Sequence, residues 1–147
     1  SQLLALFELT RRCAAKPKED LVTIASSMEV VQLYTPRLAY LDKEYLVALY
    51  LNSRQELLAE ETISIGTVNA SLIHPREVYK PALLESASSL ILVHNHPSGD
   101  PEPSEGDIYA TEQIAMTGEI LGIPLTDHII LARQSFFSFK ERGLLTP

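Results

Sequence analysis

Hydrophobic residues fall along this chain in two patterns, short continuous apolar runs and longer runs with helical spacing. Continuous runs of strand length are typical of strands that are buried on both faces. The clearest of them is YLVALYL at residues 45–51. Read in this way, the apolar runs predict strands over residues 45–51, 56–65, 70–73, 89–93, 125–132 and 135–139.

Helical spacing and helix-start signals predict the remaining elements. Ser26 is followed three residues later by Glu29, the spacing of a capping box, in which each side chain satisfies a free backbone amide at the start of a helix. The apolar pattern then continues to Pro36, which lacks an amide hydrogen, so we expect a kink there and a second short helix through residues 38–41. Other helices are predicted over residues 1–15, 75–87 and 104–121.

The alternation of strands and helices predicts an α/β domain with a mixed central sheet and helices packed on it. A chain of 147 residues is long enough for one domain with a sizeable core. We expect this domain to occupy residues 21–147. Residues 1–20 are predicted to be an N-terminal helix and linker, the remnant of a trimmed upstream region, because the chain starts within a helical pattern and without Met.

Composition narrows the class of function. The net charge is −7, from 12 Lys and Arg against 19 Asp and Glu, and no Lys or Arg lies between Lys80 and Arg133. Proteins that bind nucleic acid normally carry a basic face, so we do not expect DNA to bind through the residues of this chain. No apolar run approaches the length of about 20 residues that spans a bilayer. Cys13 is the only cysteine, which excludes an internal disulfide and fits a cytoplasmic protein without a membrane partner.

The residues that can carry chemistry are concentrated in the segment 94–107, HNHPSGDPEPSEGD, directly after an apolar strand. His94 and His96 are two residues apart, so in extended backbone both imidazoles point to the same side. Asp107 falls in the first turn of the helix predicted from Ser104. Two histidines and a carboxylate can form a three-ligand metal site, and the open fourth position is typical of a catalytic rather than a structural zinc.

A simpler interpretation exists for part of this segment. Ser104 and Asp107 have the spacing of a capping box, and that structural role explains both residues without a metal. It explains neither His94 nor His96, nor the Pro-rich loop that brings these groups together. The joint pattern therefore favours a metal site.

The motif His-x-His-Pro-x6-Ser-x-x-Asp, formed by His94, His96, Pro97, Ser104 and Asp107, resembles that of the JAMM (MPN-plus) metalloproteases. The longer segments GTVNASLIHPREV, LVHNHPSGDPEPSEGDI and TDHIIL are similar to the RadC family, a bacterial branch of this class. The similarity runs over nearly the whole chain. It implies one Zn²⁺ ion held by His94, His96 and Asp107.

The resemblance also implies a fold and a substrate class. The fold is a JAMM/MPN-like, or cytidine-deaminase-like, domain over residues 21–147, and the substrate is a peptide or protein. Asn95 stands where the eukaryotic proteins of this class usually have Ser or Thr, and in this it matches the RadC proteins. Because RadC proteins carry a DNA-repair label, a second hypothesis is a DNA-associated binding or accessory protein without peptidase activity. A zinc nucleobase deaminase is disfavoured, because its Pro-Cys-x-x-Cys element is absent.

A hydrolase of this kind needs a general base, and the resemblance gives that role to Glu44, just before the strand 45–51. Glu60 and Glu61, in the next predicted strand, are the alternatives. Zinc lowers the pKa of bound water from about 15.7 to about 7, and Glu44 would take the proton of this water and later pass it to the leaving amine. The Ser104 hydroxyl would help to hold the developing oxyanion. Together these roles predict peptide or isopeptide hydrolysis.

Other polar residues are expected to support the site rather than to form it. His94 and His96 should each donate their second ring nitrogen to an acceptor that the pattern does not identify. Asp127 and His128, at the start of a predicted strand, are interpreted as a structural pair or as a pair that supports the ligands, rather than as a fourth ligand. Nothing in the pattern indicates an oligomeric state.

Overall fold

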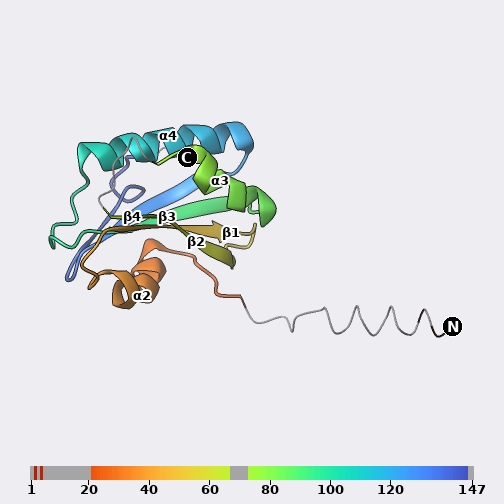
Figure 1. The fold of residues 1–147 in the computed structure, drawn as a ribbon, viewed down its shortest axis with the longest axis horizontal. Coiled ribbons are helices and arrows are strands. Elements are labelled where there is room, and N and C mark those ends of the chain that lie inside the picture. Colours follow the sequence, from red (N-terminus) through yellow and green to blue (C-terminus); the bar gives the residue numbers. More distant parts are fainter. Residues whose placement is uncertain (1, 3, 5–20, 67–72, 146–147) are drawn as a thin grey trace.

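The computed structural model describes residues 2, 4, 21–66 and 73–145, which contain a five-stranded sheet with helices on both faces (Figure 1). Helix α2 covers one face of the sheet, and α3 and α4 cover the other. The strands are β1 (Tyr45–Leu51), β2 (Leu57–Ile65), β3 (Ser89–Asn95), β4 (Leu125–Leu131) and β5 (Phe136–Ser138). The helices are α2 (Ser27–Leu38), α3 (Pro75–Leu84) and α4 (Glu105–Leu121). The predicted α/β fold with a mixed sheet is thus confirmed.

The order of strands in the sheet is β2-β1-β3-β4-β5. Strand β1 is antiparallel to both of its neighbours, β3 is parallel to β4, and β5 is antiparallel to β4. A parallel pair needs a crossover, and α4 supplies it between β3 and β4. The start of α4 therefore follows closely after the carboxyl end of β3, and this end of the sheet holds the site.

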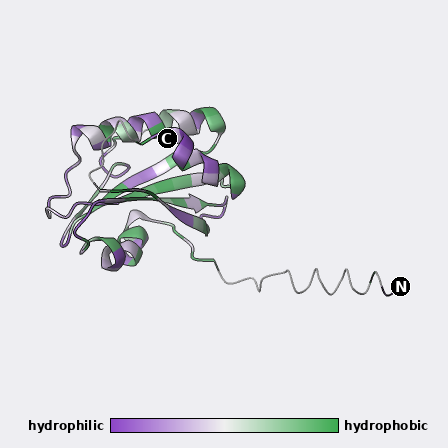
Figure 2. Cartoon of the chain, viewed as in Figure 1, coloured by the Kyte–Doolittle hydropathy of each residue, from purple (hydrophilic) through white to green (hydrophobic). Residues whose placement is uncertain are grey.

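The central strands separate two hydrophobic cores, and Figure 2 shows their hydrophobic residues between the layers of helices. In β3, Leu90 and Leu92 pack in the core beneath α3 and α4, whereas Ile91 and Val93 pack in the core beside α2. Successive side chains of a strand point to opposite faces. His94 therefore continues the row that faces α4, and Asn95 continues the row that faces α2.

Two of the predicted helix boundaries are wrong. Helix α2 runs without a break from Ser27 to Leu38 and includes Pro36, so the predicted kink and second helix at 38–41 are not formed. Pro36 lies in the last turn, where it removes a single hydrogen bond, and the burial of Tyr34 and Leu38 on either side of it holds the helix in place.

Helix α3 ends at Leu84 rather than near residue 87. Ser86 has a φ of 53°, and the amides of Ser86 and Ala87 donate to the carbonyls of Leu83 and Ala82. This is the Schellman arrangement, in which a residue in the left-handed conformation ends a helix. Glycine usually occupies that position, so the sequence did not signal the end.

Two predicted elements fall largely outside the described residues, namely the helix at 1–15 and the strand at 70–73. Of the second, only Ile73 is described, and it lies in no strand. The other strands agree with the prediction to within two residues. None of the helices in the described part of the chain is long and apolar enough to cross a membrane.

Candidate metal centre

The site lies where three elements meet at one end of the sheet. His94 is near the end of β3, and His96 follows that strand directly. Asp107 lies in the first turn of α4. Leu46 of β1 pairs with His94, so Glu44, two residues before Leu46, lies beside the two histidines.

The side chains of this cluster bring possible ligand atoms close to one another. Asp107 places Oδ1 3.4 Å from Nδ1 of His94 and Oδ2 3.3 Å from Nε2 of His96. Ligand atoms that are about 2.0–2.1 Å from a tetrahedral zinc lie about 3.3 Å from one another, which matches both distances. Glu44 places Oε2 3.7 Å from Nε2 of His94, and Glu44, His94 and His96 each offer a ligand atom within 4.8 Å of the others.

His94 shows the clearest sign of a missing partner. Its side chain is 1% exposed, and within the described part of the chain neither of its ring nitrogens has a hydrogen-bond partner. Buried polar atoms in folded proteins are nearly always hydrogen-bonded, and an exception needs an explanation such as an ion. A metal ligand requires a lone pair on one of these nitrogens, and this histidine has one available.

His96 is oriented as a metal ligand by its other ring nitrogen. Nδ1 lies 2.8 Å from the carbonyl oxygen of Asp100. A carbonyl can only accept, so Nδ1 carries the hydrogen and Nε2 of the neutral ring has a lone pair. That lone pair faces the Asp107 carboxylate at 3.3 Å. Two acceptors this close require a proton or a cation between them, and a metal ion meets that requirement.

Asp107 serves the helix and the site together. The backbone amide and the hydroxyl of Ser104 both donate to Oδ2 of Asp107, each at 2.8 Å, and the amide of Asp107 donates to the Ser104 hydroxyl at 3.1 Å. The predicted capping box is therefore formed. The helix amino terminus stabilises the carboxylate, while Oδ1 remains directed at His94. The structural and the metal interpretations of this pair are compatible.

In the absence of a metal, the electrostatics favour the protonation states that ligands need at His94 and Asp107, but favour the protonated ring at His96. Burial lowers the pKa of His94. Burial also acts to lower the pKa of His96, but Asp107 and the Asp100 carbonyl raise it overall. Burial acts to raise the pKa of Asp107, yet the neighbouring His96 ring and the hydrogen bonds from Ser104 hold it well below its usual range. Near neutral pH, Asp107 is thus an anion and His94 a neutral base, as metal binding requires.

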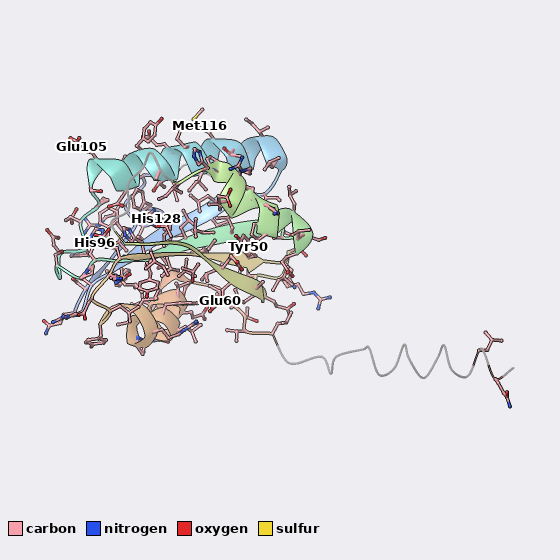
Figure 3. The ribbon with its side chains drawn as sticks, viewed as in Figure 1. Tyr50, Glu60, His96, Glu105, Met116 and His128 are labelled. Atoms are coloured by element: carbon pink, nitrogen blue, oxygen red, sulfur yellow. The ribbon has the colours of Figure 1, made fainter. Side chains whose placement is uncertain are left out.

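Of the three glutamates considered as a base, the structure brings only Glu44 to the cluster. Its side chain is 29% exposed, so water can reach the histidines from its side. Glu60 accepts hydrogen bonds from Arg37 and Tyr34 on the face that α2 covers. Figure 3 shows it apart from His96, which lies below the start of α4. Glu61 pairs with Ala48, farther along β1. Among the described residues, the group whose ligand atoms lie close enough together to hold a metal consists of Glu44, His94 and His96. It contains neither Glu60 nor Glu61, and Asp107 lies beside this group rather than within it.

Behind His94 lies a buried polar pair that the sequence interpretation missed. Nδ1 of His128 is 2.7 Å from the Thr111 hydroxyl, which lies 2.5 Å from the Asp107 carbonyl oxygen. Burial lowers the pKa of His128 to about 3, so its ring is neutral. The ring centroid lies 6.0 Å from that of His94, with the planes nearly parallel. The i, i+4 spacing of Asp107 and Thr111 on a helix was the available signal.

The predicted pairing of Asp127 with His128 is not formed by their side chains. The Asp127 carboxylate accepts from the hydroxyl of Ser138 at 2.7 Å and from the amide of Lys140 at 3.0 Å. Adjacent residues of a strand point to opposite faces, so His128 faces α4 and Asp127 faces away from it. Asp127 instead ties β4 to the turn that follows β5.

A mixed α/β sheet with His-x-His at the end of a strand, Asp in the first turn of the next helix and Glu before the neighbouring strand defines a domain of the JAB (JAMM/MPN) class. Comparison with family models agrees, because the RadC-like JAB domain matches residues 24–144. The chain therefore belongs to the RadC-like JAB domain family.

Similar proteins occur in bacteria and archaea. A UPF0758 protein of Desulforamulus reducens is 50% identical over 144 residues, which cover 98% of this chain and 63% of that protein. A UPF0758 protein of Methanococcoides burtonii is 47% identical over 99% of this chain and 64% of its own length. One from Listeria monocytogenes is 41% identical over 97% of this chain and 64% of its own. The chain thus spans just under two thirds of these relatives, whose name states no activity.

Proposed function

We propose that this protein is a zinc-dependent hydrolase of peptide or isopeptide bonds, with His94, His96 and Asp107 as metal ligands and Glu44 as general base. The observation that carries the proposal is the convergence of these four side chains, in which Nε2 of His96 lies 3.3 Å from Oδ2 of Asp107 and Oε2 of Glu44 lies 3.7 Å from Nε2 of His94. The unpartnered ring nitrogens of His94 support the same site.

The burial of the four residues separates ligands from base. His94, His96 and Asp107 have side chains that are 1%, 11% and 2% exposed, whereas Glu44 is 29% exposed. Three buried ligands leave a fourth position open in a catalytic zinc site. Glu44 stands on the solvent side of the histidines, where a water molecule and a substrate would arrive, and this place suits a base better than a structural ligand.

The chemistry then divides between the ion and the chain. Zinc in this site supplies a Lewis acid that activates water and polarises a carbonyl. Glu44 takes a proton from the attacking water and returns it to the leaving amine. The hydrogen bonds from the amide and hydroxyl of Ser104 keep the Asp107 carboxylate negatively charged, as a ligand of the ion must be. The Ser104 hydroxyl also supplies the oxyanion hydrogen bond, which requires that its proton turn away from Asp107.

The substrate class follows from the resemblance to JAMM proteases and agrees with the charge of the chain. The net charge is −7, and residues 81 to 132, which include the proposed ligands, carry no Lys or Arg, whereas a phosphate backbone is normally bound by basic side chains. The competing hypothesis, a DNA-associated accessory role without hydrolysis, receives no support from the described residues.

The proposal is tested with zinc-loaded protein and a mixture of natural peptides and ε-linked lysine isopeptides, with new termini identified by mass spectrometry. We expect cleavage by the wild type and a loss of about 10²-fold or more in Glu44→Gln, the size of a general-base contribution. Glu60→Gln is the matched control and should cleave like the wild type. Failure of the zinc-loaded wild type to cleave any of these bonds, or equal cleavage by Glu44→Gln, would contradict the proposal.

A further inference from the structure

Asn95, between the two histidines, has a fully buried side chain that makes two hydrogen bonds to the backbone of another segment. Its Oδ1 accepts from the amide of Tyr45 at 2.6 Å, and its Nδ2 donates to the carbonyl of Lys43 at 2.9 Å. A backbone amide can only donate and a carbonyl can only accept. The orientation of the Asn95 amide is therefore fixed by chemistry as well as by geometry.

The two groups that Asn95 binds lie on either side of Glu44. The Lys43 carbonyl belongs to the planar peptide unit before the Glu44 α-carbon, and the Tyr45 amide belongs to the unit after it. The only soft torsions between these two planes are φ and ψ of Glu44. One side chain thus restrains both backbone torsions of Glu44. The amide of Gly66, which follows β2, also donates to the Glu44 carbonyl, at 2.8 Å.

The position of Glu44 in the fold explains why the two hydrogen bonds of Asn95 matter. Strand β1 begins at Tyr45, and its pairing with β3 ends at Leu46 and His94. Glu44 therefore lies beyond the last backbone pairing of these two strands. There the Asn95 side-chain amide, rather than the backbone ladder, connects β3 to the segment that contains Glu44. His94 and His96 point to one face of the sheet, and Asn95 points to the other. Residues 94–96 therefore provide two proposed metal ligands and also hydrogen-bond to the segment that carries the proposed base, Glu44.

We propose that Asn95 is a positioning residue, which holds the backbone of Glu44, and with it the point from which the Glu44 side chain extends, in place relative to the metal ligands. This inference rests on the proposed function, since it assumes that Glu44 is the base. Removal of the amide should leave His94, His96 and Asp107 in place but let Glu44 shift. A displacement of about 1 Å at a catalytic group can lower turnover by about 10²-fold, and substitution of residues that orient a metal site typically costs about 10- to 100-fold.

The test uses cobalt(II) in place of zinc, because its visible absorption reports the surroundings of the ion. The spectrum is titrated with pH for the wild type, Glu44→Gln, Asn95→Ala and the double variant. Asn52→Ala is the matched control. Like Asn95, Asn52 makes two side-chain hydrogen bonds to the backbone, but its Oδ1 accepts both, from the amides of Arg54 at 2.9 Å and Glu56 at 3.0 Å, and it lies in the turn between β1 and β2.

We expect Asn95→Ala to bind as much cobalt as the wild type and to shift the midpoint of the pH-dependent spectral change in the same direction as Glu44→Gln. In the Glu44→Gln background, Asn95→Ala should add no further shift, because it acts through Glu44. Asn52→Ala should titrate like the wild type. On a peptide cleaved by the zinc protein, Asn95→Ala should lower kcat by about 10- to 100-fold with little change in KM. Asn95→Ser serves if Asn95→Ala does not fold, as judged by circular dichroism.

The results separate this inference from the proposed function. If Glu44→Gln alters the titration and folded Asn95→Ala does not, the positioning role is wrong and the proposed function stands. If Asn95→Ala is folded but loses cobalt, Asn95 acts on the histidines and the inference is also wrong. If the wild type binds no cobalt, or Glu44→Gln leaves the titration unchanged, the role of Glu44 fails and both are refuted.

Discussion

The Ser104 hydroxyl is bonded both to the start of α4 and to a proposed metal ligand, and Ser104→Ala should therefore affect both stability and metal binding. The hydroxyl accepts from the Asp107 amide and donates to Asp107 Oδ2. The substitution removes both bonds and leaves the backbone in place. The chain offers a matched control in Ser26, which starts α2 with a capping box of the same kind, formed with Glu29, but at an exposed position away from the site.

The two serines differ in what their substitution removes. Loss of a serine cap costs about 1 kcal/mol of helix stability, and this is the whole effect expected for Ser26→Ala. Ser104 in addition donates to an ionised carboxylate that is 2% exposed, and a hydrogen bond to a charged group contributes about 1.5–3 kcal/mol. We expect Ser104→Ala to lower the free energy of unfolding of the metal-free protein by about 2.5–4 kcal/mol.

Metal affinity separates the two variants more sharply. Groups that orient a metal ligand typically contribute about 10- to 100-fold to affinity, so Ser104→Ala should weaken zinc binding by about that factor. Ser26→Ala should bind zinc as tightly as the wild type. Stability is measured by urea unfolding in the presence of a chelator, and affinity by competition with a chromogenic zinc chelator. If Ser104→Ala loses stability but keeps wild-type zinc affinity, the hydroxyl does not orient a ligand and this reasoning is refuted.

Three further predictions test the packing and electrostatics of the fold. In Gly118→Ala a new Cβ would lie 2.6 Å from the Ile123 carbonyl oxygen. The cost of overpacking, about 1–3 kcal/mol, should exceed the gain in helix propensity of about 1 kcal/mol, so urea unfolding should show a less stable protein. A more stable variant would refute this close contact. Burial lowers the pKa of His128 to about 3, so the unfolded chain binds the proton that the folded protein excludes. The free energy of unfolding should fall as pH decreases from about 6.5 towards 3, with a smaller slope in His128→Gln; an unchanged slope would contradict the assignment. Arg37→Gln breaks an ion pair with Glu60 in which the side chains are 54% and 36% exposed. It should lower the free energy of unfolding by less than about 1 kcal/mol. A loss of several kcal/mol in urea unfolding would show that this pair contributes more than an exposed pair should.

The sequence predicted those features of this fold that depend on local pattern. The runs at 45–51 and 89–93 became the buried central strands β1 and β3, because a continuous apolar run has to be covered on both faces. The proposed ligands could be predicted for a similar reason. His94 and His96 share a face by strand geometry, and Asp107 comes to them because a short loop joins β3 to the start of α4.

The features that the sequence interpretation missed depend on contacts between distant segments. The role of Asn95 requires the pairing of β1 with β3, which brings Lys43 and Tyr45 within reach of its amide. The neutral, buried state of His128 follows from its packing against Phe139 and Thr111. Helix α2 passes through Pro36 because Tyr34 and Leu38, two residues before and two residues after it, are buried. The partners of Asn95 and of His128 lie far from them in the sequence, so no short window of sequence contains both members of these contacts.

The central claim is that His94, His96 and Asp107 bind a metal ion, and metal content tests it most directly. Protein purified without added metal or chelator is analysed by atomic emission, as wild type, His96→Ala and His74→Ala. His74 is an exposed histidine at the start of α3 that makes no side-chain cap, so it controls for loss of any histidine. The account predicts about one zinc ion per chain in the wild type and in His74→Ala, and none in His96→Ala. A wild type without metal even after zinc is offered, or a His96→Ala variant that keeps it, would contradict the account.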